Sequence, residues 1–120
     1  MMDYSKLSDF EIDKAVADAL GINYDIAIMF VNPADKVNGN HVEEYVRKKI
    51  TSNEKHWKRF SPTRIPNDAF HIIEDNRISI RNRYEGSWEA ENEWGESCSH
   101  ISRSPLRAAM VVFLMMQEGK

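Results

Sequence analysis

The chain has 120 residues, of which 42% are hydrophobic and 29% charged, and its formal net charge is −3. That composition excludes a disordered chain, and the length fits one domain over residues 1–120 with its own core. The single cysteine, Cys98, excludes an internal disulfide and fits a reducing compartment. The sequence has neither an apolar run of about 20 residues nor the apolar core of a signal peptide at its start. We therefore expect a soluble, cytoplasmic protein that does not bind a membrane.

The first predicted element is a helix from Leu7 to Gly21. Ser8 and Glu11 have the spacing of a capping box, in which each side chain satisfies the other's free backbone N–H group. Apolar residues follow at helical spacing, and Gly21 is suited to the left-handed conformation that ends a helix.

The next segments are less regular. Tyr24–Val31 alternates and is rich in β-branched and aromatic residues, which favours a strand, although a buried helix is the competing interpretation. His41–Ile50 has apolar residues at helical spacing and predicts a second, more exposed helix. Ser52–Ile65 has no period and is bounded by prolines, so we expect mostly loop. Residues 32–65 are interpreted as a candidate mobile or inserted segment.

The second half of the chain carries clearer signals. Pro66–Asp75 predicts a short helix that Asn76 ends. Alternating residues on both sides of Glu85-Gly86 predict a β-hairpin with one apolar and one charged face. Glu93–Arg103 is polar and is expected to be loop.

The last predicted element is the helix Ser104–Gly119, with Ser104 as its cap and Pro105 in the first turn. Its residues are apolar around most of the circumference, which is typical of a helix buried on more than one side. We expect it to be the centre of the core. Together the elements predict an α+β fold, with a small antiparallel sheet that includes a hairpin and is layered with helices.

Three segments carry a family resemblance. Asp3–Ala17, Pro66–Ile80 and Pro105–Glu118 resemble, in the same order, blocks of the NinX family of lambdoid phages and prophages. The chain departs from the family pattern at Phe70, where Trp is usual, and at His71, where Pro is usual. The resemblance implies an αβα sandwich-like fold and a phage or prophage accessory protein in a bacterial host. It supplies no catalytic residues.

Candidates for metal binding or nucleophilic catalysis are sparse. Cys98 and His100 lie two residues apart, and His71 and Glu74 share a helix face, but structural zinc needs about four such ligands at matched spacing. The sequence has no nucleophile elbow and no glycine-rich phosphate loop. We therefore expect a non-enzymatic protein with no metal and no cofactor.

Nucleic-acid binding has the strongest local signal. Residues 47–64 carry seven bases against one acid, interleaved with aromatic residues. Cations can neutralise phosphates, and aromatic rings can stack on unpaired bases. The candidate contacts are Arg47, Lys48, Lys49, Lys55, Trp57, Lys58, Arg59 and Arg64. The alternative is a solvated charged loop whose Trp57 and Phe60 pack into the core.

Protein–protein interaction is the leading hypothesis from the sequence. Small accessory proteins act by binding something, and the C-terminal helix has more apolar surface than a 120-residue domain need cover. The remainder would form a homodimer face or a groove for a host or phage protein. In the alternative, the sheet and the first helix bury that helix completely.

Overall fold

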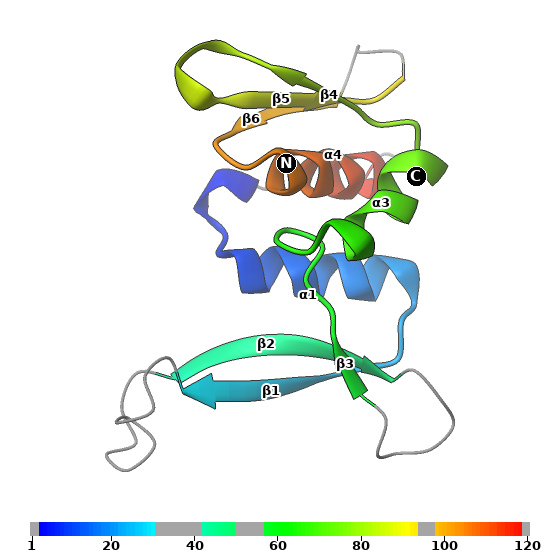
Figure 1. The fold of residues 1–120 in the computed structure, drawn as a ribbon. Helices are drawn as coiled ribbons and strands as arrows, with labels where there is room; N and C mark the ends of the chain where they lie inside the picture. Colours follow the sequence, from blue (N-terminus) through cyan, green and yellow to red (C-terminus); the bar gives the residue numbers. More distant parts are fainter. Residues whose placement is uncertain (1–2, 31–41, 50–56, 94–97, 119–120) are drawn as a thin grey trace.

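The computed structural model describes residues 3–30, 42–49, 57–93 and 98–118, which form two three-stranded antiparallel sheets with helices between them (Figure 1). The elements in chain order are η1 (Tyr4–Lys6), α1 (Asp9–Leu20), β1 (Tyr24–Phe30), β2 (Val42–Lys49), β3 (Trp57–Arg59), α3 (Pro66–Asp75), β4 (Ser79–Asn82), η2 (Tyr84–Gly86), β5 (Trp88–Glu91), β6 (Ser99–Ser102) and α4 (Pro105–Glu118). Sheet A has the order β1-β2-β3, and sheet B has the order β4-β5-β6.

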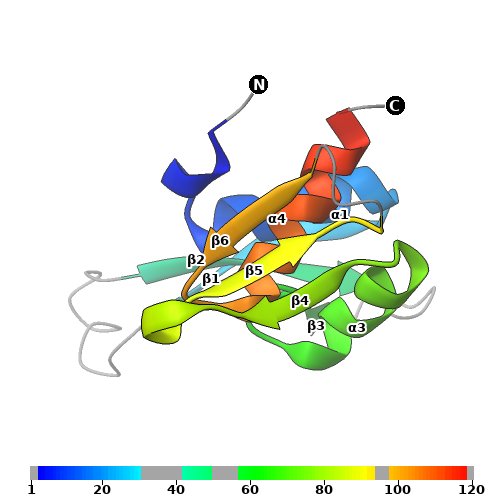
Figure 2. The same cartoon turned by 90° about the horizontal axis from the view of Figure 1, so that it is seen from above.

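The elements are arranged in four layers. Sheet A, α1, α4 and sheet B follow one another through the molecule in Figure 1, and Figure 2 shows β4, β5 and β6 lying over α4. The predicted α+β class is confirmed. The layering differs from the αβα sandwich-like arrangement with one sheet that was expected, because in the described residues the helices lie between two sheets and each sheet has helices on one face only.

The helix α1 begins and ends where its sequence predicts. Ser8 and Glu11 form both bonds of the capping box, since the Ser8 hydroxyl accepts from the Glu11 N–H and the Glu11 carboxylate accepts from the Ser8 N–H. Gly21 ends the helix at a φ of 70°. Ile12 and Val16 are completely buried, which fixes the face that α1 turns to the core.

The helix α4 is the centre of the core, as predicted. Ser104 Oγ accepts a hydrogen bond from the Arg107 N–H at 3.2 Å and so caps the helix. Residues Ala108 to Leu114 are all buried. The helix contacts α1, α3 and all three strands of sheet B. No described residue of α4 is among the most exposed large apolar side chains, and Leu106, Met115 and Met116 are partly buried, so little of its apolar surface is left for a partner.

Sheet B contains the predicted hairpin and one strand that the sequence analysis missed. β4 and β5 pair with Ile80 opposite Ala90 and Arg81 opposite Glu89, which gives the expected apolar and charged faces. The expectation of loop over Glu93–Arg103 is wrong at β6, which pairs with β5. Ser, His and Ser carry little strand signal, and the backbone pairing with β5 rather than local preference makes this segment a strand.

Sheet A corrects two predictions. Residues 42–49 form β2 and not a helix, because pairing with β1 along its full length satisfies the backbone of both strands. An eight-residue segment is too short for its apolar spacing to distinguish helix from strand. The expected loop over 52–65 contains β3, which pairs with the end of β2. Residues 31–41 and 50–56 lie outside the described part of the chain.

Two buried carboxylates attach the end of sheet A to the helices. Asp13 of α1 accepts from the Ser61 hydroxyl at 2.7 Å and from the Thr63 N–H at 3.0 Å. Asp68 of α3 accepts from the Ser61 N–H at 3.0 Å. We call Asp13, Asp68, Ser61 and Thr63 the carboxylate clamp. It fixes the chain immediately after β3.

Replacing Phe113 by Ala should lower the free energy of unfolding by about 3–5 kcal/mol, because Phe113 is 3% exposed at the centre of α4. The matched control is Phe70→Ala on α3, where the ring is 58% exposed, and it should cost less than about 1 kcal/mol. Chemical denaturation measures both. A loss below about 1 kcal/mol for Phe113→Ala would contradict the central place of α4.

The clamp also predicts a pH dependence. Burial raises the pKa of Asp13 above its ordinary value of 3.8, and the hydrogen bonds from Ser61 and Thr63 only partly oppose this. The Asp13 carboxyl therefore binds its proton more tightly in the folded protein than in the unfolded chain. As a result, the contribution of Asp13 to the free energy of unfolding falls as pH rises above 3.8. Relative to Asp13→Asn, the wild type should become more stable as pH is lowered from neutrality toward that value. Denaturation curves with no pH-dependent difference between the two proteins would contradict this.

Candidate nucleic-acid interface

In the part of the chain that the structure describes, sheet A has one covered and one uncovered face. Val46 of β2 and Phe60 after β3 are buried on the side of α1. Because side chains alternate along a strand, the residues of odd number in the paired strands lie on the opposite side. We call this side the outer face. Its members are Asp25, Ala27, Met29, Glu43, Tyr45, Arg47, Lys49, Trp57 and Arg59.

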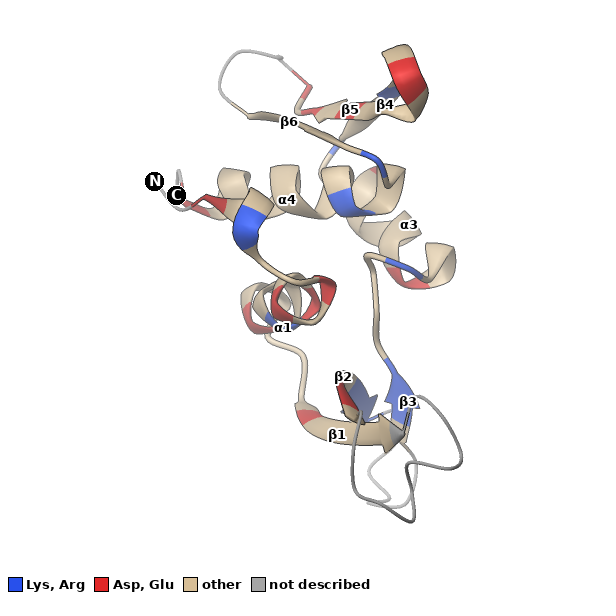
Figure 3. Ribbon diagram, turned by 90° about the vertical axis from the view of Figure 1, so that its left-hand side faces the viewer, with Lys and Arg blue, Asp and Glu red and all other residues tan. Residues whose placement is uncertain are grey.

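The predicted contact residues do not all lie on the outer face of sheet A. Four of them lie on the outer face, namely Arg47, Lys49, Trp57 and Arg59. Lys48 and Lys58 lie opposite each other on the other face, where the Lys48 ammonium is 5.6 Å from the centre of the buried Phe60 ring. Arg64 follows β3, and its Nε is 3.3 Å from Asp9 of α1. Lys55 lies outside the described residues. Figure 3 shows the basic segments of β2 and β3 together, at the end of the molecule away from sheet B.

Arg47 and Arg59 are directly opposite each other on neighbouring strands. Like charges in that position repel. Asp25 accepts from Arg47 at 2.9 Å, and that hydrogen bond holds the pKa of the Asp25 carboxyl below its usual value. No carboxylate of the described residues lies within 4.0 Å of Arg59. The Nε atoms of both arginines are buried and have no hydrogen-bond partner among the described residues. The pair therefore has donors and positive charge to offer an anion.

Aromatic rings flank the arginine pair. The Arg47 guanidinium is 4.8 Å from the centre of the Trp57 ring, and that of Arg59 is 5.5 Å from the centre of the Tyr45 ring. With Met29, these four side chains line an open cavity of about 330 Å³. Trp57 is half-buried on this face, whereas Phe60 belongs to the core, so the basic stretch is neither a simple solvated loop nor a uniform binding segment.

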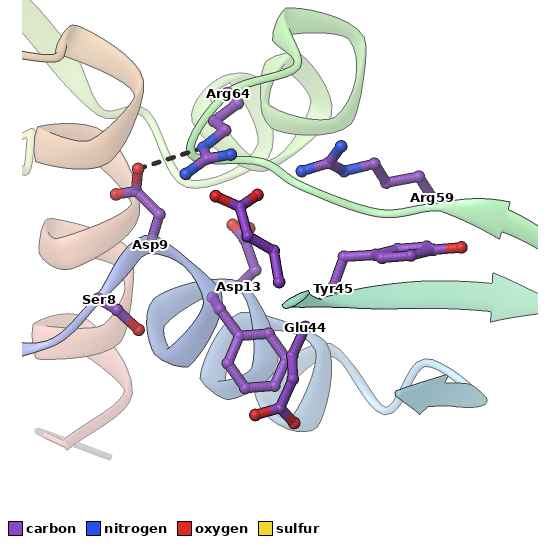
Figure 4. A pocket seen from close by; sticks show the side chains of 9 residues that line it. Ser8, Asp9, Asp13, Glu44, Tyr45, Arg59 and Arg64 are labelled. Carbon is purple, nitrogen blue, oxygen red and sulfur yellow. Dashed lines mark hydrogen bonds and ion pairs between the residues drawn. The ribbon is translucent and has the colours of Figure 1, made fainter. Parts of the chain in front are cut away.

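A second cavity of about 230 Å³ continues from the first, because Tyr45 and Arg59 line both. Figure 4 shows Arg59 extending along Tyr45 toward a hollow that Arg64 and Asp13 also border. The N-terminal end of α1 and the start of β2 complete this hollow with the carboxylates of Asp9, Asp13, Glu43 and Glu44. The positive character is therefore concentrated in the first cavity.

Sequence reasoning missed Tyr45, Met29 and Asp25 as members of this site. Tyr45 and Arg47 are two residues apart, and that spacing places them on one face only if the segment is a strand. The prediction of a helix over 41–50 concealed the relation. Met29 and Asp25 come from β1, and only the pairing of β1 with β2 brings them beside the basic residues.

The other chemical candidates lie elsewhere. Cys98 is buried next to β6, and burial lowers the pKa of His100 on that strand. His71 is exposed on α3. Over the described part of the chain, no three His, Cys, Asp or Glu side chains come together as the ligands of a metal ion would.

Comparison with known proteins identifies the chain. None of its described helices has the length and hydropathy to cross a bilayer. No curated protein sequence matches it. The family described as Bacteriophage P22, NinX matches residues 3–117, which is nearly the whole chain. The three resembling segments are thus part of one continuous match, and the protein belongs to the Bacteriophage P22 NinX family.

Proposed function

We propose that this phage protein binds single-stranded nucleic acid across the outer face of sheet A, as a non-enzymatic accessory protein in the bacterial cytoplasm. One observation carries the proposal. Arg47 and Arg59 face each other on neighbouring strands, and Asp25, which pairs with Arg47, lies on the far side of Arg47 from Arg59. Among the described residues, the Nε atoms of both arginines are buried without a hydrogen-bond partner. Such a pair is unfavourable by itself and becomes favourable when an anion lies between the two guanidinium groups.

A phosphodiester is the anion that fits the surroundings best. Phosphate oxygens accept from guanidinium groups with matching geometry, and a nucleic acid presents aromatic bases next to each phosphate. The cavity offers the Tyr45 and Trp57 rings beside Arg59 and Arg47. A simple inorganic anion would use the arginines but would have no use for the rings.

The rings also favour a single strand over a duplex. Bases in a duplex are stacked on one another, whereas unpaired bases are free to stack on aromatic side chains or on an Arg guanidinium. In addition, the net charge of the protein is −3, and the second cavity, which shares Tyr45 and Arg59 with the first, is lined by acidic residues. These charges disfavour the long electrostatic contact that non-specific duplex binding needs.

The first prediction concerns charge. Wild-type protein should bind a labelled single-stranded oligonucleotide in fluorescence anisotropy, with an affinity that falls as salt rises. Arg59→Glu should weaken binding by roughly tenfold or more, because it removes a phosphate contact and adds a repelling charge. The matched control is Arg103→Glu, which makes the same change of charge at an exposed residue before α4 and should leave the affinity nearly unchanged.

Three outcomes would contradict the proposal. The first is no binding even at low salt. The second is equal loss of affinity in the Arg59 and Arg103 variants, which would mean that only net charge matters. The third is tighter binding of double-stranded than of single-stranded oligonucleotides of the same length, which would exclude base stacking as the source of affinity.

The second prediction concerns stacking. Tyr45→Leu keeps an apolar side chain of moderate size on β2 but removes the ring, and should weaken single-strand binding by about 1–3 kcal/mol. The slope of affinity against salt should stay as in the wild type, because no charge changes. Unchanged affinity would exclude Tyr45 as a stacking residue, and a changed slope would indicate that the substitution had displaced Arg59.

Binding to a host or phage protein, as expected from the sequence, is the alternative to nucleic-acid binding. Most of the apolar surface of α4, on which it depended, is buried among the described residues, and Leu106, Met115 and Met116 are partly buried. This leaves only a small apolar surface of α4 for a partner. Cross-linking in infected cells measures it directly, and a reproducible partner that still binds the Arg59→Glu variant would favour a protein partner over nucleic acid.

A further inference from the structure

β1 is one of the two edge strands of sheet A, and among the described residues its outer edge is unpaired. The Lys49 N–H donates to the Asn23 carbonyl at 3.1 Å, so the backbone groups of Asn23 and of every second residue after it point toward β2. The Phe60 N–H donates to the Val46 carbonyl at 2.8 Å, which gives β2 the matching alternation. The N–H and C=O groups of Tyr24, Ile26, Ile28 and Phe30 therefore point away from the sheet. No strand of the described residues pairs with them.

The edge is unusual in its chemistry as well as its length. β1 has seven residues and the sequence YDIAIMF, with no basic residue. Its single charge, Asp25, is already paired with Arg47. The other end strands have four residues or fewer and carry charged or polar side chains, such as Lys58 in β3 and Arg81 in β4. Charges of that kind commonly protect an edge against pairing, and β1 lacks them.

Three exposed apolar side chains lie at or next to this edge. Ile28 is 59% exposed, and Met29 is exposed on the opposite face of the strand. Val42 is also exposed and lies diagonally across from Ile28, since it pairs with the neighbouring Phe30. A partner strand along β1 would cover Ile28 on one face and Met29 on the other.

We propose that two copies of this chain pair through their β1 strands, antiparallel and about a two-fold axis at Ile28, so that the two A sheets become one six-stranded sheet. A second copy of the chain is the partner that fits this edge, because β1 can pair with another β1 strand residue by residue. With the axis at Ile28, each Ile28 lies beside Ile28 of the partner subunit, and the backbone of each Ile26 lies opposite that of Phe30 of the partner subunit. The two exposed Ile28 side chains meet each other, and the two Asp25 carboxylates stay apart.

The hydrogen bonds select this register. The Ile26 N–H is already held by the Asp25 carboxylate at 2.8 Å. A two-fold axis at Ala27 would need that N–H for its central pairs. With the axis at Ile28, the central pair uses only the outward N–H and C=O of each Ile28, and the Phe30 N–H donates to the Ile26 carbonyl of the partner subunit. The Ile26 N–H is called on only for the outer bonds to the partner's Phe30 carbonyl, so the central bonds form with the Asp25 bond intact.

The pairing goes beyond the proposed nucleic-acid binding and does not require it. In a continuous sheet, the outer faces of both copies lie on the same side. Two arginine–aromatic cavities would then be presented to one strand of nucleic acid. A single strand long enough to reach both would bind more tightly than a short one through the effective concentration of the second site.

The test is the mass in solution of purified full-length protein, measured by analytical ultracentrifugation over a wide range of concentration. The wild type should approach twice the monomer mass as concentration rises. Ile28→Lys should remain monomeric, because it places like charges directly opposite each other at the axis. The matched control is Ile101→Lys, which introduces the same residue at a 51% exposed position on β6 and should still dimerise. A monomeric wild type, or equal loss in both variants, would overturn the proposal.

Amide hydrogen exchange of the wild type keeps the proposal testable if Ile28→Lys fails to fold. The Ile28 N–H should exchange quickly in dilute protein and slowly in concentrated protein, while the Ala27 N–H, which points to β2, should be protected at both concentrations. Fast exchange at Ile28 in protein that is dimeric would mean that the interface lies elsewhere. Neither measurement includes nucleic acid, so each outcome is independent of the proposed function.

Discussion

The fold depends on one requirement, which is to bury a helix that is apolar around most of its circumference. α4 has seven consecutive buried residues, so no single neighbour can cover it. Sheet B covers one side and α1 covers another. The face of α1 turned away from α4 then needs a cover of its own, and Val46 and Phe60 of the sheet A region supply it. The order sheet A, α1, α4, sheet B follows from this succession of apolar faces.

The same succession explains why the candidate site lies where it does. Sheet A is the last layer, and the described residues cover only the face that carries Val46. An antiparallel sheet with one solvated face can place polar side chains there at no cost to the core. The opposed pair Arg47 and Arg59 nevertheless reduces stability, since Asp25 neutralises one charge only. Local arrangements that reduce stability are expected at functional sites and not at ordinary solvated surfaces.

The sequence predicted the elements whose signals are local. Ser8, Glu11 and Gly21 define α1 within their own turns, and Glu85-Gly86 defines the hairpin of sheet B. β2 and β3 were missed because each depends on pairing with a strand that is distant in the sequence or itself weakly marked. β6 pairs with the predicted β5 but was missed because its own residues carry little strand signal. The basic aromatic stretch was found from composition alone. Its separation into an outer pair, Arg47 and Arg59, and an inner pair, Lys48 and Lys58, needs strand alternation, and no composition argument supplies that.

The carboxylate clamp connects the core to the candidate site. Arg59 is the last residue of β3, and the backbone that follows is held by Asp13 and Asp68 through Ser61 and Thr63. Phe60 and Pro62, the two neighbours of Ser61 in the sequence, are also buried. The position of the backbone at Arg59 is therefore fixed by α1 and α3 as well as by the pairing of β3. A guanidinium positioned before the ligand arrives loses less conformational entropy on binding. The desolvation of Asp13, which raises its pKa, is a cost to the fold that keeps this part of the outer face in place.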